Sequence, residues 1–399
     1  MLKEYLISYG LDESIVNRVK NDRYTERRML EKAVIIHVHL HELGFAKEQI
    51  LTIVNKFPRI YWCSKDRINE KMNLLKELGF NDSEVIFTCT SNPFIFNYSN
   101  ESILEKIDYF VSIGLTKKQA LNTLSMWNNS FFRTKLYVEN KVNYLMSIGF
   151  KKDAIVRMIK TNPSIIWNSF YQRMEQFKKL GYKENEVVKM HSYFSNLHAM
   201  TLDTIKNKIE ELKSLGYLES EVLKMTIALP QIFSYSLESI KEKLLFLRTL
   251  GLSEREVKKI TLVNTDVISY SIDTLASKIN TFSYLGYSNE RIKYIVLDFP
   301  SILNSSIESI VEKITYLKSI GLDNLVINNP KDLIQSNILT KSRYEYFKSI
   351  GILINEDNYR ELYLGNEAFK LKYGITKEEL IKLYGDKKTT KKELKKEGE

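Results

Sequence analysis

The 399-residue chain contains 59 Lys and Arg residues against 49 Asp and Glu residues, which gives a formal net charge of +10. Hydrophobic residues make up 44% and charged residues 27%, with only 15 Gly and 6 Pro, a composition that disfavours a disordered or β-rich chain. The positive balance suggests a polyanionic partner.

The sequence also bears on the compartment. Cys63 and Cys89 are too few for a disulfide framework, which fits a reducing compartment. No apolar run reaches the eighteen or so residues that a membrane span needs. Residues 1–16 lack the features of a secretory signal and carry acidic residues, which organelle transit peptides avoid. The sequence alone therefore predicts a cytoplasmic protein without a membrane segment.

A glycine between an apolar residue and a bulky apolar residue recurs along the chain, at intervals of 30 to 35 residues. Glycine adopts the left-handed conformation that ends a helix, and the apolar residue after it packs back on the last turn. Each of these glycines is therefore predicted to end a helix. They are Gly10, Gly44, Gly79, Gly114, Gly149, Gly181, Gly216, Gly251, Gly286, Gly321 and Gly351.

Two further columns of residues lie between successive glycines. The first is a turn position, occupied by Pro58, Pro93, Pro163, Pro230 and Pro300, and by Asn128, Ser195 and Thr265 in the other units. The second is a hydroxylic position that can cap the start of a helix, because its oxygen accepts hydrogen bonds from free amides. It comprises Ser64, Ser99, Thr134, Ser169, Thr201, Ser236, Ser271 and Ser306.

Each unit thus predicts a helix of about ten residues, a turn, and a second helix of about fourteen. One such pair cannot bury its own apolar face, so neighbouring pairs must stack. The predicted fold is all-α, a solenoid of about eight regular repeats that is curved with a concave face. Its predicted parts are an N-terminal cap (1–43), the repeats (44–321), a capping repeat (322–351) and a helical segment with a Lys-rich tail (352–399).

The repeat resembles that of the mitochondrial transcription termination factor (mTERF) family. In that family a Leu-Gly-Leu/Phe stop is followed by a short helix, a Pro-x-aliphatic-aliphatic turn and a Ser-capped helix. NPFIFNYSNESILEKIDYFVSIGL (92–115) and FPSILNSSIESIVEKITYLKSIGL (299–322) carry this pattern, and the resemblance covers about residues 10–351. Three of the eight units lack the proline, and the unit that ends at Gly181 is three residues short.

The resemblance implies a non-enzymatic protein that binds double-stranded DNA or structured RNA and affects transcription termination or RNA processing. It also makes a mitochondrial or plastid matrix the alternative compartment, because the family is known chiefly from these organelles. A helical-repeat adaptor that binds a protein in its concave face is the alternative function, since periodicity and charge suit both. A monomer that needs no cofactor is expected.

A basic residue stands eight positions before each glycine of the repeats, and equivalent positions of stacked repeats lie on one line. This basic ladder could follow the phosphates of a nucleic acid. Alternatively, each cation lies at the edge of the core, covers apolar neighbours with its stem and pairs with an acid of its own helix. The ladder comprises Lys71, Lys106, Lys141, Arg173, Lys208, Lys243, Lys278, Lys313 and Arg343.

A second basic line, eight residues after the glycine, comprises Arg157, Lys189, Lys224 and Lys259. Three of its members follow a glutamate by three residues, which predicts salt bridges on the helix surface. Those glutamates are Glu186, Glu221 and Glu256. Because these salt bridges would account for the lysines, the second basic line is the secondary candidate for nucleic-acid contact.

The remaining candidates are aromatic residues and histidines. Tyr98, Tyr235 and Tyr270 border the turns, where they could stack on bases, but a hydrophobic staple over the cap also accounts for them. In HVHLHE (37–42), His37 and His41 could share a helix face, yet no third metal ligand follows at a recognisable spacing. No nucleophile–base pattern or phosphate-binding loop occurs, so neither a catalytic residue nor a metal site is predicted.

Overall fold

The computed structural model describes residues 1–19, 25–125, 133–322, 332–333 and 335–385. Every regular element in these ranges is a helix, as predicted. The chain divides into two compact units, Met1–Ile205 and Lys206–Glu399. No helix in the described ranges is both long and apolar enough to cross a membrane.

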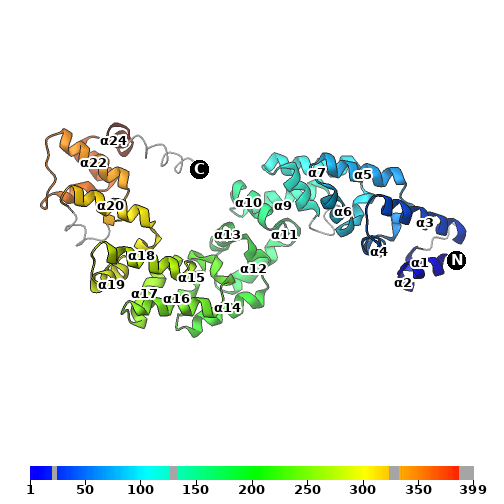
Figure 1. Cartoon of the computed structure of the whole chain (residues 1–399), viewed down its shortest axis with the longest axis horizontal. Helices are drawn as coiled ribbons and strands as arrows, with labels where there is room; N and C mark the ends of the chain where they lie inside the picture. The colour runs from blue at the N-terminus through cyan, green and yellow to red at the C-terminus, as the bar shows by residue number, and fades with distance from the viewer. Residues whose placement is uncertain (20–24, 126–132, 323–331, 334, 386–399) are drawn as a thin grey trace. The chain divides into compact units, whose positions relative to one another are not determined.

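The first unit starts with α1 (Leu2–Tyr9), α2 (Glu13–Val19) and α3 (Glu26–Glu42). Repeats of a first helix, a short turn helix and a second helix follow (Figure 1). The first helices are α4 (Lys47–Lys56), α6 (Asp82–Ser91), α8 (Lys117–Ser125), α10 (Lys152–Thr161) and α13 (Glu184–Tyr193). The turn helices are η1 (Pro58–Trp62), η2 (Pro93–Asn97), α11 (Ser164–Trp167) and η4 (Ser195–His198). The second helices are α5 (Lys65–Glu77), α7 (Asn100–Ile113), α9 (Lys135–Ser147) and α12 (Phe170–Lys179).

The second unit continues the same alternation, and α14 (Leu202–Ser214) runs into it from the first. Its first helices are α15 (Glu219–Ala228), α17 (Glu254–Val263) and α19 (Asn289–Asp298). Its turn helices are η5 (Pro230–Ser234), η6 (Thr265–Ser269) and η7 (Pro300–Asn304). The second helices after α14 are α16 (Leu237–Thr249), α18 (Ile272–Tyr284), α20 (Ile307–Ser319) and α22 (Asn337–Ser349). The unit closes with η9 (Tyr359–Tyr363), α23 (Asn366–Tyr373) and α24 (Lys377–Tyr384).

The predicted start and stop residues of the helices are confirmed. All eight hydroxylic residues accept a hydrogen bond from the amide three residues later, as Ser236 does from Ser239 at 3.1 Å. All eleven glycines have a positive φ, between 72° and 117°. At Gly286 the amide bonds to Ser283 O (3.0 Å) and the next amide to Phe282 O (3.1 Å), the bond pair that closes a helix C-terminus.

The turn position begins a 3₁₀ helix in most repeats. Pro58, Pro93, Pro230 and Pro300 are each the first residue of theirs, where a missing N–H costs no helical hydrogen bond. Ser195 and Thr265 begin η4 and η6 without proline, whereas Pro163 precedes the single α-helical turn of α11. Asn128 lies outside the described residues.

Like elements of neighbouring repeats stack on one another. In the first unit α4 packs on α6 and α10 on α13; in the second, α15 packs on α17, α17 on α19, and α18 on α20. One continuous apolar core runs through the second unit from Leu247 to Leu380. The repeats therefore form a solenoid within each unit, as predicted. The four-part division into 1–43, 44–321, 322–351 and 352–399 stays a prediction.

The repeat does not stop at Gly351, although the sequence pattern breaks down there. The turn helix η9 and α24 both pack on α22, at places where a following repeat would lie. Residues 352–358, where a first helix would stand, contain none. The second unit thus ends with a shortened repeat that the sequence analysis missed.

Candidate nucleic-acid interface

The basic ladder lies mostly inside the protein. Its cations all stand on second helices. Three members are half-buried, namely Lys141, Arg173 and Lys243. Six have exposed fractions of only 1–7%, namely Lys71, Lys106, Lys208, Lys278, Lys313 and Arg343.

Five ladder cations bond to the next repeat. Arg173 donates to His198 O (2.6 Å) and Met200 O, and Lys278 donates to Ser305 O. These three carbonyls lie at the end of the turn, where helix geometry leaves carbonyl groups without partners. The five donors and their partners are Lys71 with Asn100; Arg173 with His198 and Met200; Lys278 with Ser305; Lys313 with Ser336 and Thr340; and Arg343 with Leu362, Leu364 and Asn366.

Three ladder cations bond within their own helix. Lys106 contacts Ser102 Oγ at 3.3 Å, Lys208 pairs with Glu211, and Lys243 contacts Ser239 O at 3.0 Å. The ammonium of Lys141 lies 5.5 Å from the ring centre of Tyr137. These contacts match the alternative that placed the cations at the core edge.

Burial disfavours the charged form of the ladder cations. It lowers the pKa of Lys313 to about 7 and that of Arg343 to about 10. It also lowers the pKa values of Lys71, Lys106 and Lys278. To reach a phosphate, a buried head would have to leave its partners unsatisfied, and phosphate contact by the ladder stays a prediction.

The second basic line has the opposite character. Arg157, Lys189, Lys224 and Lys259 are all exposed on first helices, and none has a hydrogen-bond or ion-pair partner among the described residues. Among the described residues, the predicted salt bridges are not formed. The carboxylates of Glu186, Glu221 and Glu256 instead accept hydrogen bonds from backbone amides at the start of their own helices. The donors are the backbone amides of Lys183 for Glu186 (2.7 Å), of Leu218 for Glu221 (2.8 Å) and of Ser253 for Glu256 (2.7 Å).

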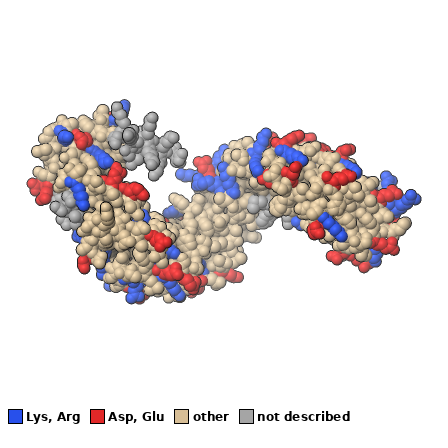
Figure 2. Space-filling model, viewed as in Figure 1, with Lys and Arg blue, Asp and Glu red and all other residues tan. Residues whose placement is uncertain are grey.

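In the first unit, Arg157 of α10 and Lys189 of α13 line one pocket of about 530 Å³. Lys151 and Asp153 also line it, so three cations face one carboxylate. Figure 2 shows blue side chains gathered over α10.

In the second unit, Lys224 and Lys259 project from α15 and α17, which pack side by side. Other lysines of the first helices have partners. Lys258 of α17 donates to Gly216 O (3.1 Å) and Lys293 of α19 to Gly251 O (2.6 Å), so each satisfies a carbonyl at the end of a second helix.

The histidines of HVHLHE have protein partners. His37 lies in the core and bonds to the hydroxyls of Tyr5 (2.9 Å) and Tyr61 (2.7 Å). His39 bonds to Asn69 Oδ1 and His41 to Tyr9 Oη, each at 2.9 Å. No group of three possible metal ligands occurs in the described ranges.

The turn tyrosines cover ladder cations. The ammonium groups of Lys106 and Lys278 lie 5.4 Å and 5.2 Å from the ring centres of Tyr98 and Tyr270. Base stacking by Tyr98, Tyr235 and Tyr270 stays a prediction.

Sequence reasoning missed Arg67, which donates to Phe96 O (2.7 Å) and Asn97 O (2.9 Å). It also missed the exposed rings of Phe87 and Tyr193, because it considered aromatic residues only at the borders of the turns.

Comparison with known proteins agrees with the repeat geometry. A model of the mTERF family matches residues 21–132, 132–249 and 204–370. A search of curated proteins finds no significant match. The matched segments contain every regular repeat, the eight hydroxyl-capped helices and all the glycine stops except Gly10. The chain therefore belongs to the mTERF family.

Proposed function

We propose that this chain is a non-enzymatic nucleic-acid-binding protein that regulates transcription termination or RNA processing. The observation that carries the proposal is the second basic line, whose four cations are exposed and have no acidic partner among the described residues. Membership of the mTERF family supports the same role. Phosphate groups attract unpaired, solvent-facing cations, and repeated positions on stacked helices bring such cations to similar places in successive repeats.

The basic ladder has a supporting role in this proposal. Its cations join one repeat to the next and so hold the first helices at fixed positions. Arg157 and Lys189 are presented by helices whose stacking depends on such bonds, for example that between Arg173 and Met200. The residues that contact the nucleic acid and those that position them are therefore different.

The salt dependence of binding tests the proposal. Changing Arg157, Lys189, Lys224 and Lys259 together to Gln removes four exposed charges and leaves the buried bonds intact. Each lost phosphate contact lowers the slope of log affinity against log salt by about 0.9 for duplex DNA or about 0.7 for a single strand. We expect a loss of roughly three to four slope units with duplex DNA and an unchanged melting temperature.

The matched control changes the ladder residues Lys208, Lys243 and Lys278 to Gln. This variant should melt earlier but keep the slope of the parent. A second control, truncation after Gly385, removes the Lys-rich tail. Binding that does not depend on salt in any of these proteins would contradict the proposal and favour an adaptor that binds a protein.

Family membership also bears on the compartment. It favours a mitochondrial or plastid matrix over the cytoplasm that the sequence predicted, because the family is known chiefly from these organelles. Imaging of the full-length protein with a C-terminal fluorescent tag, in its native cell, distinguishes the two compartments.

A further inference from the structure

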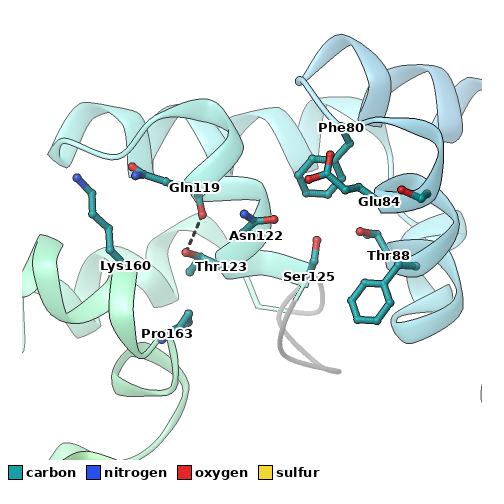
Figure 3. A pocket seen from close by; sticks show the side chains of 11 residues that line it. Phe80, Glu84, Thr88, Gln119, Asn122, Thr123, Ser125, Lys160 and Pro163 are labelled. Atoms are coloured by element: carbon teal, nitrogen blue, oxygen red, sulfur yellow. Dashed lines mark hydrogen bonds between the residues drawn. The ribbon is translucent and has the colours of Figure 1, made fainter. Parts of the chain in front are cut away.

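Two pockets lie on either side of α10 in the first unit. The pocket of Arg157 and Lys189 lies between α10 and α13. The other, of about 410 Å³, is lined by residues of α6, α8 and α10, with Lys160 on one side and Gln119 and Asn122 in the middle (Figure 3). Pockets of this size accommodate small organic groups. Because α10 is their shared wall, and a helix is about 10 Å across, both lie within reach of one short ligand segment.

Each pocket contains an aromatic ring that is mostly exposed. Phe87 lines the first pocket and Tyr193 the second, and each side chain is 68% exposed. Rings of this size normally contribute to a core or an interface. An exposed ring beside unpaired cations is the combination that binds single-stranded nucleic acid, because the ring stacks on a base while the cations meet the backbone.

The position of Phe87 in its repeat strengthens this reading. Phe87 stands eight residues after Gly79, the position that Arg157 and Lys189 occupy in their repeats. Asn122 holds the same position after Gly114 and is exposed in the first pocket. Along the first unit this one line therefore offers a ring, an amide and two cations in successive repeats.

The acidic residues of the two pockets do not cancel this charge. In the first pocket, Glu84 accepts from the amide of Asn81 (2.9 Å) and pairs with Lys118 (2.8 Å). Lys160 has no ion-pair partner among the described residues. In the second pocket, Asp153 faces three cations. A polyanion therefore suits this face better than an acidic or a neutral ligand.

We infer that the face of the first unit around α10 binds single-stranded nucleic acid, with unpaired bases stacked on Phe87 and Tyr193. The amide of Asn122 can bond to a base edge, as can the NH₂ group of Gln119, whose Oε1 accepts from Thr116 N (3.0 Å). Arg157 and Lys160 meet the phosphates. A duplex hides the faces of its bases, so it cannot use the two rings. This inference rests on the proposed function and specifies the form of nucleic acid that this face recognises.

The test compares a Phe87→Leu, Tyr193→Leu variant of the full chain with its parent. The probes are an oligouridylate, the same backbone without bases, and a duplex of equal length, all at one salt concentration. Loss of one stacked base weakens binding by about 5- to 150-fold. We expect the variant to bind the oligouridylate at least about 5-fold more weakly than the parent does. It should bind the abasic strand and the duplex as tightly as the parent does. Tyr284→Leu is the matched control, because Tyr284 is 88% exposed on α18 and lines neither pocket.

The outcomes separate this inference from the proposal on which it rests. Equal binding of the oligouridylate by parent and variant, with salt-dependent binding retained, overturns the stacking role alone. A parent that binds duplex far more tightly than the single strand overturns it as well. Absence of binding to all three probes overturns both the inference and the proposed function.

Discussion

Burial lowers the pKa of three imidazoles, to about 4 for His37 and His198 and to about 3 for His191. The cause in each case is chiefly the loss of hydration, which disfavours the charged ring. In the unfolded chain the same groups titrate near pH 6.5. The folded state therefore binds fewer protons than the unfolded state once the pH falls below that value, and stability declines with it.

The contribution of these imidazoles to the free energy of unfolding should accordingly be constant above about pH 6.5 and fall as the pH drops toward about 4. At one pH unit below 6.5, the free energy of unfolding is lower by about 1.4 kcal/mol for each imidazole, or by up to about 4 kcal/mol for the three together. Urea unfolding at neutral and mildly acidic pH measures this difference.

His198→Leu provides the control for this prediction. Neither ring nitrogen of His198 has a hydrogen-bond partner among the described residues, and the ring stacks on Phe170 with centres 5.6 Å apart. An apolar side chain of similar size removes two unsatisfied polar atoms, so the variant should be at least as stable as the parent at neutral pH. It should also lose about 1.4 kcal/mol less than the parent in the first acidic unit. An identical pH dependence in both proteins would show that His198 is not the titrating group.

At the scale of single elements, the turn helix η6 offers a test of whether proline fits at the first position of a turn helix. Thr265 begins this turn helix where other repeats have proline, and the preceding Asn264 has φ −134° and ψ 81°. Leu229 and Phe299, which precede Pro230 and Pro300, have nearly the same angles. Thr265→Pro should therefore be tolerated and stabilise the protein by up to about 1 kcal/mol, because proline restricts the unfolded chain.

The comparison for Thr265→Pro is Thr265→Ala. Both changes remove the bond from Thr265 Oγ1 to Thr261 O (3.0 Å), but only proline restricts the backbone. Thermal unfolding should place the proline variant above the alanine variant. The reverse order would mean that the backbone of η6 differs from that of the proline-containing turns.

The ladder can be tested with two lysines of neighbouring helices. Lys278 of α18 is buried and donates to Ser305 O, whereas Lys259 of α17 is exposed. Lys278→Met leaves the carbonyl of half-buried Ser305 without this donor, so it should lower the free energy of unfolding by about 1–3 kcal/mol. Lys259→Met should change it by less than about 0.5 kcal/mol. Equal effects in chemical denaturation would contradict the positioning role of the ladder.

At the scale of the whole molecule, the sequence predicted the array of helices well. Helix ends depend on local chemistry, such as the Ser236 cap or the left-handed conformation of Gly286, and local chemistry can be recognised in sequence. The direction in which a long side chain points cannot be recognised in sequence. Lys278 lies at a position that could point to solvent or to the next repeat, and only packing decides between them.

The candidate site was harder to predict for the same reason. Glu256 stands three residues before Lys259, which suits a salt bridge, but its carboxylate binds the amide of Ser253 instead. A helix start leaves amides that compete for any nearby carboxylate. The final shortened repeat was missed because its turn helix, Tyr359–Tyr363, has neither proline nor a preceding first helix.

The bonds from Arg173, Lys278, Lys313 and Arg343 to backbone carbonyls of the next repeat have a consequence for how such a chain can change over time. Every residue has a carbonyl group, so the accepting side of the bond places no demand on the amino acid there, and the accepting residues indeed differ: His198, Ser305, Ser336 and Leu362. Only the donor must be kept. A duplicated repeat inserted into the array brings a donor for its successor and a carbonyl for its predecessor, so the array can lengthen by whole repeats without matching substitutions in its neighbours.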